Sequence, residues 1–134
     1  MAAELVLLDT SIWIEFFNRP ERPEALAVKE LIEQDRAVLA GVILAELIQG
    51  ARTKKERDLL AESLGILPFV ETDREDWREA GVLLNDLRTR GFTLPLTDAL
   101  LAQLCLRHHL AIFTLDKHFY HFRNLMRFRM EAIK

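Results

Sequence analysis

Apolar residues follow two patterns along the chain: short unbroken runs, and longer stretches in which they recur every three to four residues. The unbroken runs predict strands buried on both faces, at 5–8, 36–40, 67–70 and 111–115. The helical spacing predicts helices over 11–17, 24–34, 42–51, 59–64, 72–90 and 97–109. This alternation predicts an α/β fold, a three-layer α/β/α sandwich with a mainly parallel sheet of roughly five strands.

Local signals add detail to these elements. Pro68 places the third strand at an edge of the sheet, and the alternating charged and apolar residues at 127–130 predict another edge strand. Thr72 and Glu75 have the spacing of a capping box, and Thr97 is the expected cap of the next helix. The helical stripes include Leu26, and both tryptophans are expected to be core or interface anchors.

Length and composition limit the class of protein. The 134 residues predict one domain, 1–134, and a hydrophobic share of 50% excludes a disordered chain. The single Cys105 fits a reducing, cytoplasmic setting, and we expect neither a signal peptide nor a membrane span. The net charge of −3 argues against simple electrostatic wrapping of nucleic acid, but clustered catalytic carboxylates would be compatible with a nuclease.

Two of the predicted strands lead into an acid, Asp9 after the first and Asp116 after the last apolar run. The carboxyl ends of parallel strands meet at one edge of a sheet, where open α/β proteins place their ligands. The two carboxylates are therefore expected at the same edge. For Asp9 the alternative is a purely structural role, because Asp followed by Thr and Ser is also a common helix N-cap.

Two further acids belong to helices that should begin at this edge. Asp98 lies in the first turn of its helix, where the helix dipole alone would stabilise an anion. Glu46 stands among aliphatic residues, where a charge is buried only if it is paired or metal-bound, although a solvated edge of the helix remains the alternative. Four neighbouring carboxylates would repel one another without a divalent cation, and oxygen ligands favour Mg²⁺ or Mn²⁺. Such a site suits phosphodiester hydrolysis.

Four segments, in order, resemble the motifs of PIN-domain ribonucleases, and their size and spacing are most similar to the VapC-type toxins of toxin–antitoxin pairs. The resemblance covers nearly the whole chain. The matching segments are Asp9-Thr10-Ser11, Leu44-Ala45-Glu46-Leu47, Thr97-Asp98-Ala99-Leu100-Leu101-Ala102 and Phe113-Thr114-Leu115-Asp116-Lys117-His118-Phe119. The aliphatic strand that runs into Thr-x-Asp-Lys-x-Phe is the most specific of the four.

The resemblance implies a Mg²⁺-dependent (or Mn²⁺-dependent) endoribonuclease with a catalytic acidic pocket. That pocket would comprise Asp9, Glu46, Asp98 and Asp116. Asp9 and Asp98 would bind the metal directly, and the other two acids would complete the charge or act through water. Ser11 and Thr114 would orient a carboxylate or a water molecule by hydrogen bonding.

The resemblance also implies partners. Family members are typically homodimers and are held inactive by a cognate antitoxin protein, whose tail lies near the pocket. An apolar face formed by Trp13, Phe16 and Phe17 would receive that tail, unless these side chains belong to the core. The RNA substrate needs basic side chains, and the basic C-terminal stretch offers Arg123 and Arg127 for its phosphates.

Three other interpretations were weighed against the nuclease. A zinc site at Cys105, His109, His118 and His121 does not match the common spacing of structural zinc ligands. A phosphotransfer or phosphatase domain would need a second acid two residues after Asp9, where Ser11 stands. A non-catalytic PIN-fold binding module would not need the intact set of acids.

Overall fold

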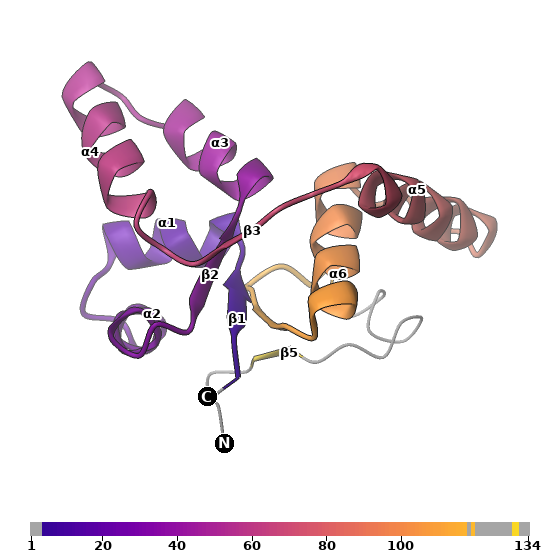
Figure 1. Ribbon diagram of the computed structural model, residues 1–134, viewed down its shortest axis with the longest axis horizontal. Helices are drawn as coiled ribbons and strands as arrows, with labels where there is room; N and C mark the ends of the chain where they lie inside the picture. Colours follow the sequence, from indigo (N-terminus) through magenta and orange to yellow (C-terminus); the bar gives the residue numbers. More distant parts are fainter. Residues whose placement is uncertain (1–3, 118, 120–129, 132–134) are drawn as a thin grey trace.

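The computed structural model describes residues 4–117, 119, 130 and 131, and it confirms the α/β sandwich (Figure 1). All strand pairs are parallel, and the sheet has the order β3-β2-β1-β4-β5. The strands are β1 (Val6–Leu8), β2 (Ala37–Ala40), β3 (Phe69–Val70), β4 (Ala111–Phe113) and β5 (Met130–Glu131). The first strand is therefore the central one, with β2 on one side and β4 on the other.

Six helices of the described chain flank this sheet. They are α1 (Thr10–Asn18), α2 (Pro23–Glu33), α3 (Gly41–Gln49), α4 (Lys54–Leu64), α5 (Arg74–Thr89) and α6 (Leu96–His108). Figure 1 shows α1 to α4 gathered on one side of the central strands and α5 with α6 on the other. None of the helices in this part of the chain is long and apolar enough to cross a membrane.

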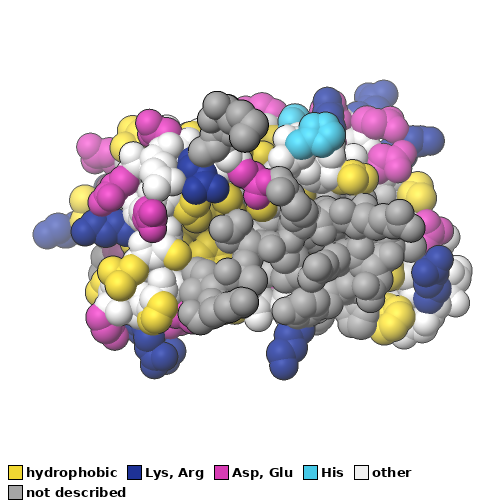
Figure 2. Space-filling view, turned by 90° about the horizontal axis from the view of Figure 1, so that it is seen from below, with side chains coloured by type: hydrophobic (Ala, Val, Ile, Leu, Met, Phe, Trp, Pro, Cys, Tyr) yellow, Lys and Arg dark blue, Asp and Glu magenta, His cyan; other side chains and the backbone are white. Residues whose placement is uncertain are grey.

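The three central strands form the middle of the hydrophobic core. Every residue of β1, β2 and β4 is buried, as unbroken apolar runs predict for strands covered on both faces. Trp13 and Phe113 are among the largest fully or almost fully buried side chains. Figure 2, the view from below, shows acidic and basic side chains interspersed around the rim, as expected for a chain of small net charge.

The predicted strands are present but shorter than the apolar runs. The strand β3 covers Phe69–Val70 of the expected 67–70, and β4 covers Ala111–Phe113 of the expected 111–115. Pro68 does precede an edge strand, β3. Gly41 follows the last residue of the second strand, as expected, and begins α3. The other edge strand is confined to Met130–Glu131, and the expected residues 127–129 lie outside the described part of the chain.

Two apolar side chains that the helical stripes assign to the interior are at the surface. Leu26 of α2 is 55% exposed and Trp77 of α5 is 48% exposed. These two helices bury only a narrow stripe, Ala25, Val28 and Leu31 in the case of α2, whereas α6 buries all residues from Ala99 to Cys105. The buried face of α2 was predicted correctly, but the width of that face depends on how closely the neighbouring helices and strands approach the helix.

The expected helix caps need correction. The capping box of α5 is formed by Asp73 and Asp76, one residue later than the predicted Thr72 and Glu75. The N-cap of α6 is Pro95, which makes no side-chain cap, so that Thr97 lies inside the helix.

Asp76 ties α5 to α6 through a buried polar cluster. Its carboxylate is fully buried and accepts a hydrogen bond of 2.7 Å from Arg107 Nη1, while Gln103 Nε2 lies 3.5 Å from its other oxygen. Arg107 also contacts Asp73 at 2.8 Å. Burying a carboxylate requires such partners, since an unpaired charge in the interior is strongly unfavourable.

We predict that Asp76→Ala lowers the free energy of unfolding by about 2 kcal/mol, because it removes the cap of α5 and the link to α6. Urea denaturation followed by circular dichroism measures this change. Asp86→Ala, at an exposed position of the same helix, is the matched control and should cost about 0.5 kcal/mol or less. Equal losses in the two variants would contradict a stabilising role of the cluster.

Candidate active site

Asp9 follows the central strand directly and serves as the N-cap of α1. Its carboxylate accepts a hydrogen bond from the backbone N–H of Ile12 at 3.3 Å, and its side chain is almost wholly buried. Asp9 therefore does have the structural role of a helix N-cap, which was the alternative for this residue. A capping role alone does not require the side chain to be buried, because most N-cap side chains are solvated at a helix end. The burial of Asp9 is explained by its other contacts.

Two hydroxyl groups connect Asp9 to the loop that follows β4. Ser11 Oγ donates to Asp9 Oδ1 at 2.5 Å, and Thr114 Oγ1 donates to Asp9 Oδ2. Each hydroxyl in turn accepts a backbone N–H of the loop, Ser11 from Leu115 at 3.1 Å and Thr114 from Asp116 at 2.8 Å. Ser11 and Thr114 thus orient the carboxylate as expected, and they also fix the loop that carries Asp116.

The surroundings of Asp9 disfavour its negative charge. Burial is the main reason that its pKa lies above the ordinary value of 3.8, and the nearby charge of Asp116 raises the pKa further. The hydrogen bonds from Ser11, Thr114 and Ile12 lower the pKa but do not outweigh the burial. The two carboxylates therefore form a pair whose repulsion a bound cation would relieve.

Glu46 is connected to the residue after Asp9, Thr10, by a hydrogen bond. Thr10 Oγ1 donates a hydrogen bond of 3.1 Å to Glu46 Oε1, and Thr10 directly follows Asp9 in the chain. Glu46 is half-buried. Its exposure is therefore intermediate between that of a paired interior acid and that of a solvated acid, the two alternatives for this residue. In the sequence, a role for Thr10 is indicated by the two consecutive hydroxyl residues after Asp9, but only the second of them, Ser11, was predicted to act in the site.

Asp98 occupies the first turn of α6, as predicted, and is half-buried. Because α6 leads into β4, which runs parallel to β1, the start of α6 lies at the carboxyl edge of the sheet. Among the residues that the structure describes, no three His, Cys, Asp or Glu side chains form a group arranged to hold a metal ion. The four-carboxylate metal site therefore stays a prediction.

The remaining candidates are either outside the described chain or engaged elsewhere. Arg123 and Arg127 lie outside the described residues, as do two of the four residues of the zinc alternative. Cys105 of that alternative is buried, and burial raises the pKa of its thiol, so that the neutral form is favoured. In the described part of the chain Cys105 packs in the hydrophobic core.

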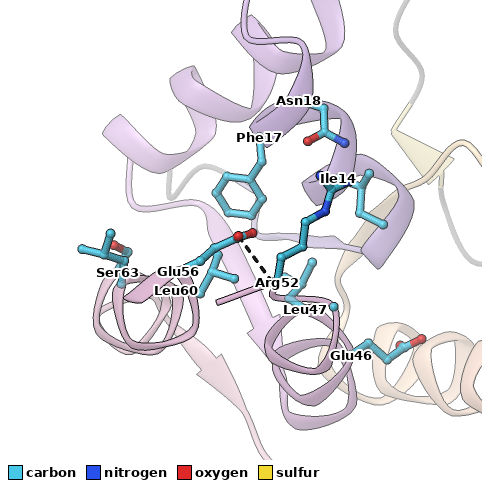
Figure 3. Close-up of a pocket in the computed structure, with 11 residues that line it drawn as sticks. Ile14, Phe17, Asn18, Glu46, Leu47, Arg52, Glu56, Leu60 and Ser63 are labelled. Carbon is cyan, nitrogen blue, oxygen red and sulfur yellow. Dashed lines mark hydrogen bonds between the residues drawn. The ribbon is translucent and has the colours of Figure 1, made fainter. Parts of the chain in front are cut away.

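A groove of about 560 Å³ opens beside Glu46, between α1, α3 and α4 (Figure 3). Its apolar lining comprises Ile14, Phe17, Leu47, Leu59 and Leu60. The expected apolar face changes accordingly: Trp13 is 1% exposed and belongs to the core, whereas Phe17 is 43% exposed and lines the groove. Trp13, Phe16 and Phe17 contact one another, so the core aromatic supports the exposed one.

Comparisons with known proteins agree with this arrangement. The PIN domain family model matches residues 6–125. A VapC ribonuclease of Mycobacterium bovis and Ribonuclease VapC11 of Mycobacterium tuberculosis are each 29% identical over 119 residues, covering 86% of this chain and 89% of theirs.

Solved structures show the same fold at lower identity. VapBC2 from Rickettsia felis, bound to a DNA fragment from its promoter, superposes with a TM-score of 0.78 at 18% identity, covering 97% of this chain and 99% of that one. VapBC-1 from nontypeable Haemophilus influenzae gives a TM-score of 0.76 at 19% identity, with coverages of 96% and 97%.

The parallel sheet between two layers of helices, with acids following its strands, places the chain in the α/β class of proteins. Within that class, the chain belongs to the PIN domain family.

We predict that Asp9→Asn stabilises the folded protein at pH 7 in the presence of EDTA. A carboxyl group with a raised pKa binds its proton more tightly in the folded than in the unfolded state. Its burial therefore costs stability above the raised pKa, and that cost disappears as the pH falls through 3.8. Asn keeps the cap and avoids the buried charge.

The measurement is the melting temperature of both proteins between pH 4 and pH 7. In the unfolded chain Asp9 is about half protonated near its ordinary pKa of 3.8, at the lower end of this range, and ionised at the upper end. The variant should melt a few degrees higher at pH 7, and the gap should narrow toward pH 4. A variant less stable than the parent at pH 7 would show that Asp9 stabilises the fold, contrary to this account.

Proposed function

We propose that the chain is a single-domain, metal-dependent endoribonuclease and the toxin of a toxin–antitoxin pair. The observation that carries this proposal is the buried Asp9, held beside Asp116 at the carboxyl end of the central strand. Membership of the PIN family supports it, as do relatives named as VapC ribonucleases. We infer a cytoplasmic setting, consistent with the free, buried Cys105.

The residues at this edge fit a hard divalent cation. All candidate ligands are carboxylate or hydroxyl oxygens, which suit Mg²⁺ or Mn²⁺, and the unfavourable charge pair of Asp9 and Asp116 is what such an ion would neutralise. In the proposal Asp9 and Asp98 bind the metal, and Glu46 and Asp116 complete the charge. The bound ion would supply a more acidic water and positive charge near the phosphate.

The chain's own contribution is to hold the carboxylates in place. Ser11 and Thr114 fix both oxygens of Asp9, so the carboxylate needs no reorganisation when a metal and substrate bind. Thr10 likewise holds one carboxylate oxygen of Glu46 in place by donating a hydrogen bond to it. Arg123 and Arg127 remain our candidates for contacts with RNA phosphates, whereas Arg107 is engaged by Asp73 and Asp76.

We predict that the purified protein cleaves RNA in the presence of Mg²⁺ or Mn²⁺ but not of EDTA. Asp9→Asn and Asp116→Asn should each lower the cleavage rate by about a hundredfold or more, because each removes charge from the proposed metal site. Gel analysis of a mixture of structured RNAs measures the rate.

Asp86→Asn is the matched control for this assay, since it removes an exposed acid of α5 far along the chain from the site. Metal binding is measured in parallel by calorimetry. Cleavage that persists in EDTA or in Asp9→Asn would contradict the proposal, and metal binding without any cleavage would favour a binding module.

We further propose that a cognate antitoxin occupies the groove between α1, α3 and α4, and that the toxin is a homodimer. Structures of similar fold include VapBC and FitAB complexes. The groove supports the proposal because it presents Phe17 and Leu59, exposed by 43% and 55%, beside an acid of the proposed site, Glu46. Apolar surface of this kind is typical of a site that another protein covers.

We predict that Phe17→Asp abolishes co-purification with the antitoxin, because a buried unpaired carboxylate is strongly unfavourable in an apolar interface. Phe92→Asp is the control, since Phe92 is similarly exposed, at 39%, but lies in the loop between α5 and α6. Loss of co-purification in both variants, or in neither, would remove the groove from the proposal.

A further inference from the structure

The polar side chain that stands out in the groove is Arg52. It lies between α3 and α4, lines the groove and is exposed. Figure 3 shows its side chain extending toward α1, where Ile14 and Asn18 are placed. Arg52 therefore brings the positive charge to a groove whose other lining residues are apolar side chains, two glutamates, an asparagine, a serine and a glycine.

The guanidinium of Arg52 has no acidic partner within the part of the chain that the structure describes. Its hydrogen bond to Glu56 is made by the backbone N–H, 3.4 Å from Glu56 Oε2, and no ion pair joins the two side chains. Glu46, the other acid of the groove, is hydrogen-bonded to Thr10. In Figure 3 the Glu46 carboxylate points away from Arg52.

A ligand that fills the groove must also satisfy this cation. Covering Arg52 removes water from its guanidinium, and a charge that loses water without gaining a partner weakens binding. A carboxylate is the best replacement because it accepts two parallel hydrogen bonds from the guanidinium. Lys54 and Lys55, exposed at the start of α4, add positive potential at the same end of the groove.

We propose that Arg52 selects the partner by pairing with a carboxylate in the segment that occupies the groove. The expected occupant is an amphipathic segment of the antitoxin, with apolar side chains on Phe17 and Leu60 and an Asp or Glu on Arg52. RNA also carries anions, but the groove is lined by apolar side chains such as Phe17 and Leu60 and by two glutamates, Glu46 and Glu56, which favour a peptide over a polyanion. This inference rests on the proposed antitoxin partner.

The test uses a displayed library of short random peptides, selected on the full chain and on two charge-reversed variants. Arg52→Glu reverses the charge in the groove. Lys55→Glu makes the same change of charge three residues away, at an exposed position that does not line the groove. Peptides whose binding is lost on Phe17→Asp are counted as ligands of the groove.

We expect peptides selected on the parent protein to be enriched in Asp and Glu, with the enrichment kept on Lys55→Glu and lost or inverted on Arg52→Glu. For a synthetic peptide from the selection, replacing the acid by its amide should weaken binding about tenfold on the parent. On Arg52→Glu the same replacement should not weaken binding, because there the acid faces a like charge. Fluorescence anisotropy measures both affinities. Arg52→Gln repeats the comparison without adding a negative charge.

Three outcomes would overturn the inference. Ligands of the groove without enrichment in acids would refute selection by Arg52 and leave the groove as a docking site. Absence of any ligand whose binding depends on Phe17 would refute both the selection by Arg52 and the groove as a docking site. Weaker binding of a single-stranded RNA oligonucleotide to Arg52→Glu, without any effect on peptides, would assign Arg52 to the substrate. Metal-dependent RNA cleavage is measured separately, so the proposed nuclease activity is tested independently of these three outcomes.

Discussion

The burial of the Asp9 carboxylate between α1 and the loop after β4 determines the geometry of the catalytic edge. The carboxylate ends the central strand, caps α1 and accepts the hydroxyls of Ser11 and Thr114. Those hydroxyls also accept backbone N–H groups of the loop, so one side chain fixes a strand end, a helix start and a loop. Through Thr10, the next residue, the arrangement extends to Glu46 on α3. The separate elements are thus brought into register by contacts to one acid.

The two aspartates that are buried in the described chain, Asp9 and Asp76, differ in their partners. Asp76 is neutralised within the chain, because Arg107 contacts its carboxylate at 2.7 Å. Asp9 receives only neutral donors in the described part of the chain, and its nearest charged influence, Asp116, is of the same sign. Ion pairing inside the fold satisfies the first acid, whereas the second has hydrogen bonds from neutral groups only, which is why it is our candidate for binding a cation. A stable domain tolerates such a site because its large apolar core compensates for it.

Much of this could be predicted from the sequence because the relevant signals are local. Buried strands in a parallel sheet are unbroken apolar runs, and the acids that follow them are visible in the chain itself. The capping box was placed one residue early because Thr72 with Glu75 and Asp73 with Asp76 both satisfy the local pattern. Only the contact of Asp76 with Arg107, thirty-one residues later, decides between them. The hydrogen bond of Thr10 to Glu46 was missed for the same reason, since it joins residues of two helices.

The groove adds a functional argument that neither the acids nor the family match contains. Helix α3 presents Glu46 to Thr10 beside the catalytic edge and Leu47, the next residue, to the groove. A protein segment in the groove therefore lies within one helical turn of an acid of the proposed site, and it can influence that acid without entering the active centre. Affinity for such a segment comes from the apolar lining, whereas discrimination between related segments requires a polar group that penalises the wrong partner. Arg52 has the position for that role, and its guanidinium has no acidic partner in the described chain. Partner choice would then depend on Arg52, between α3 and α4, whereas only Glu46 of the four proposed catalytic acids belongs to these helices.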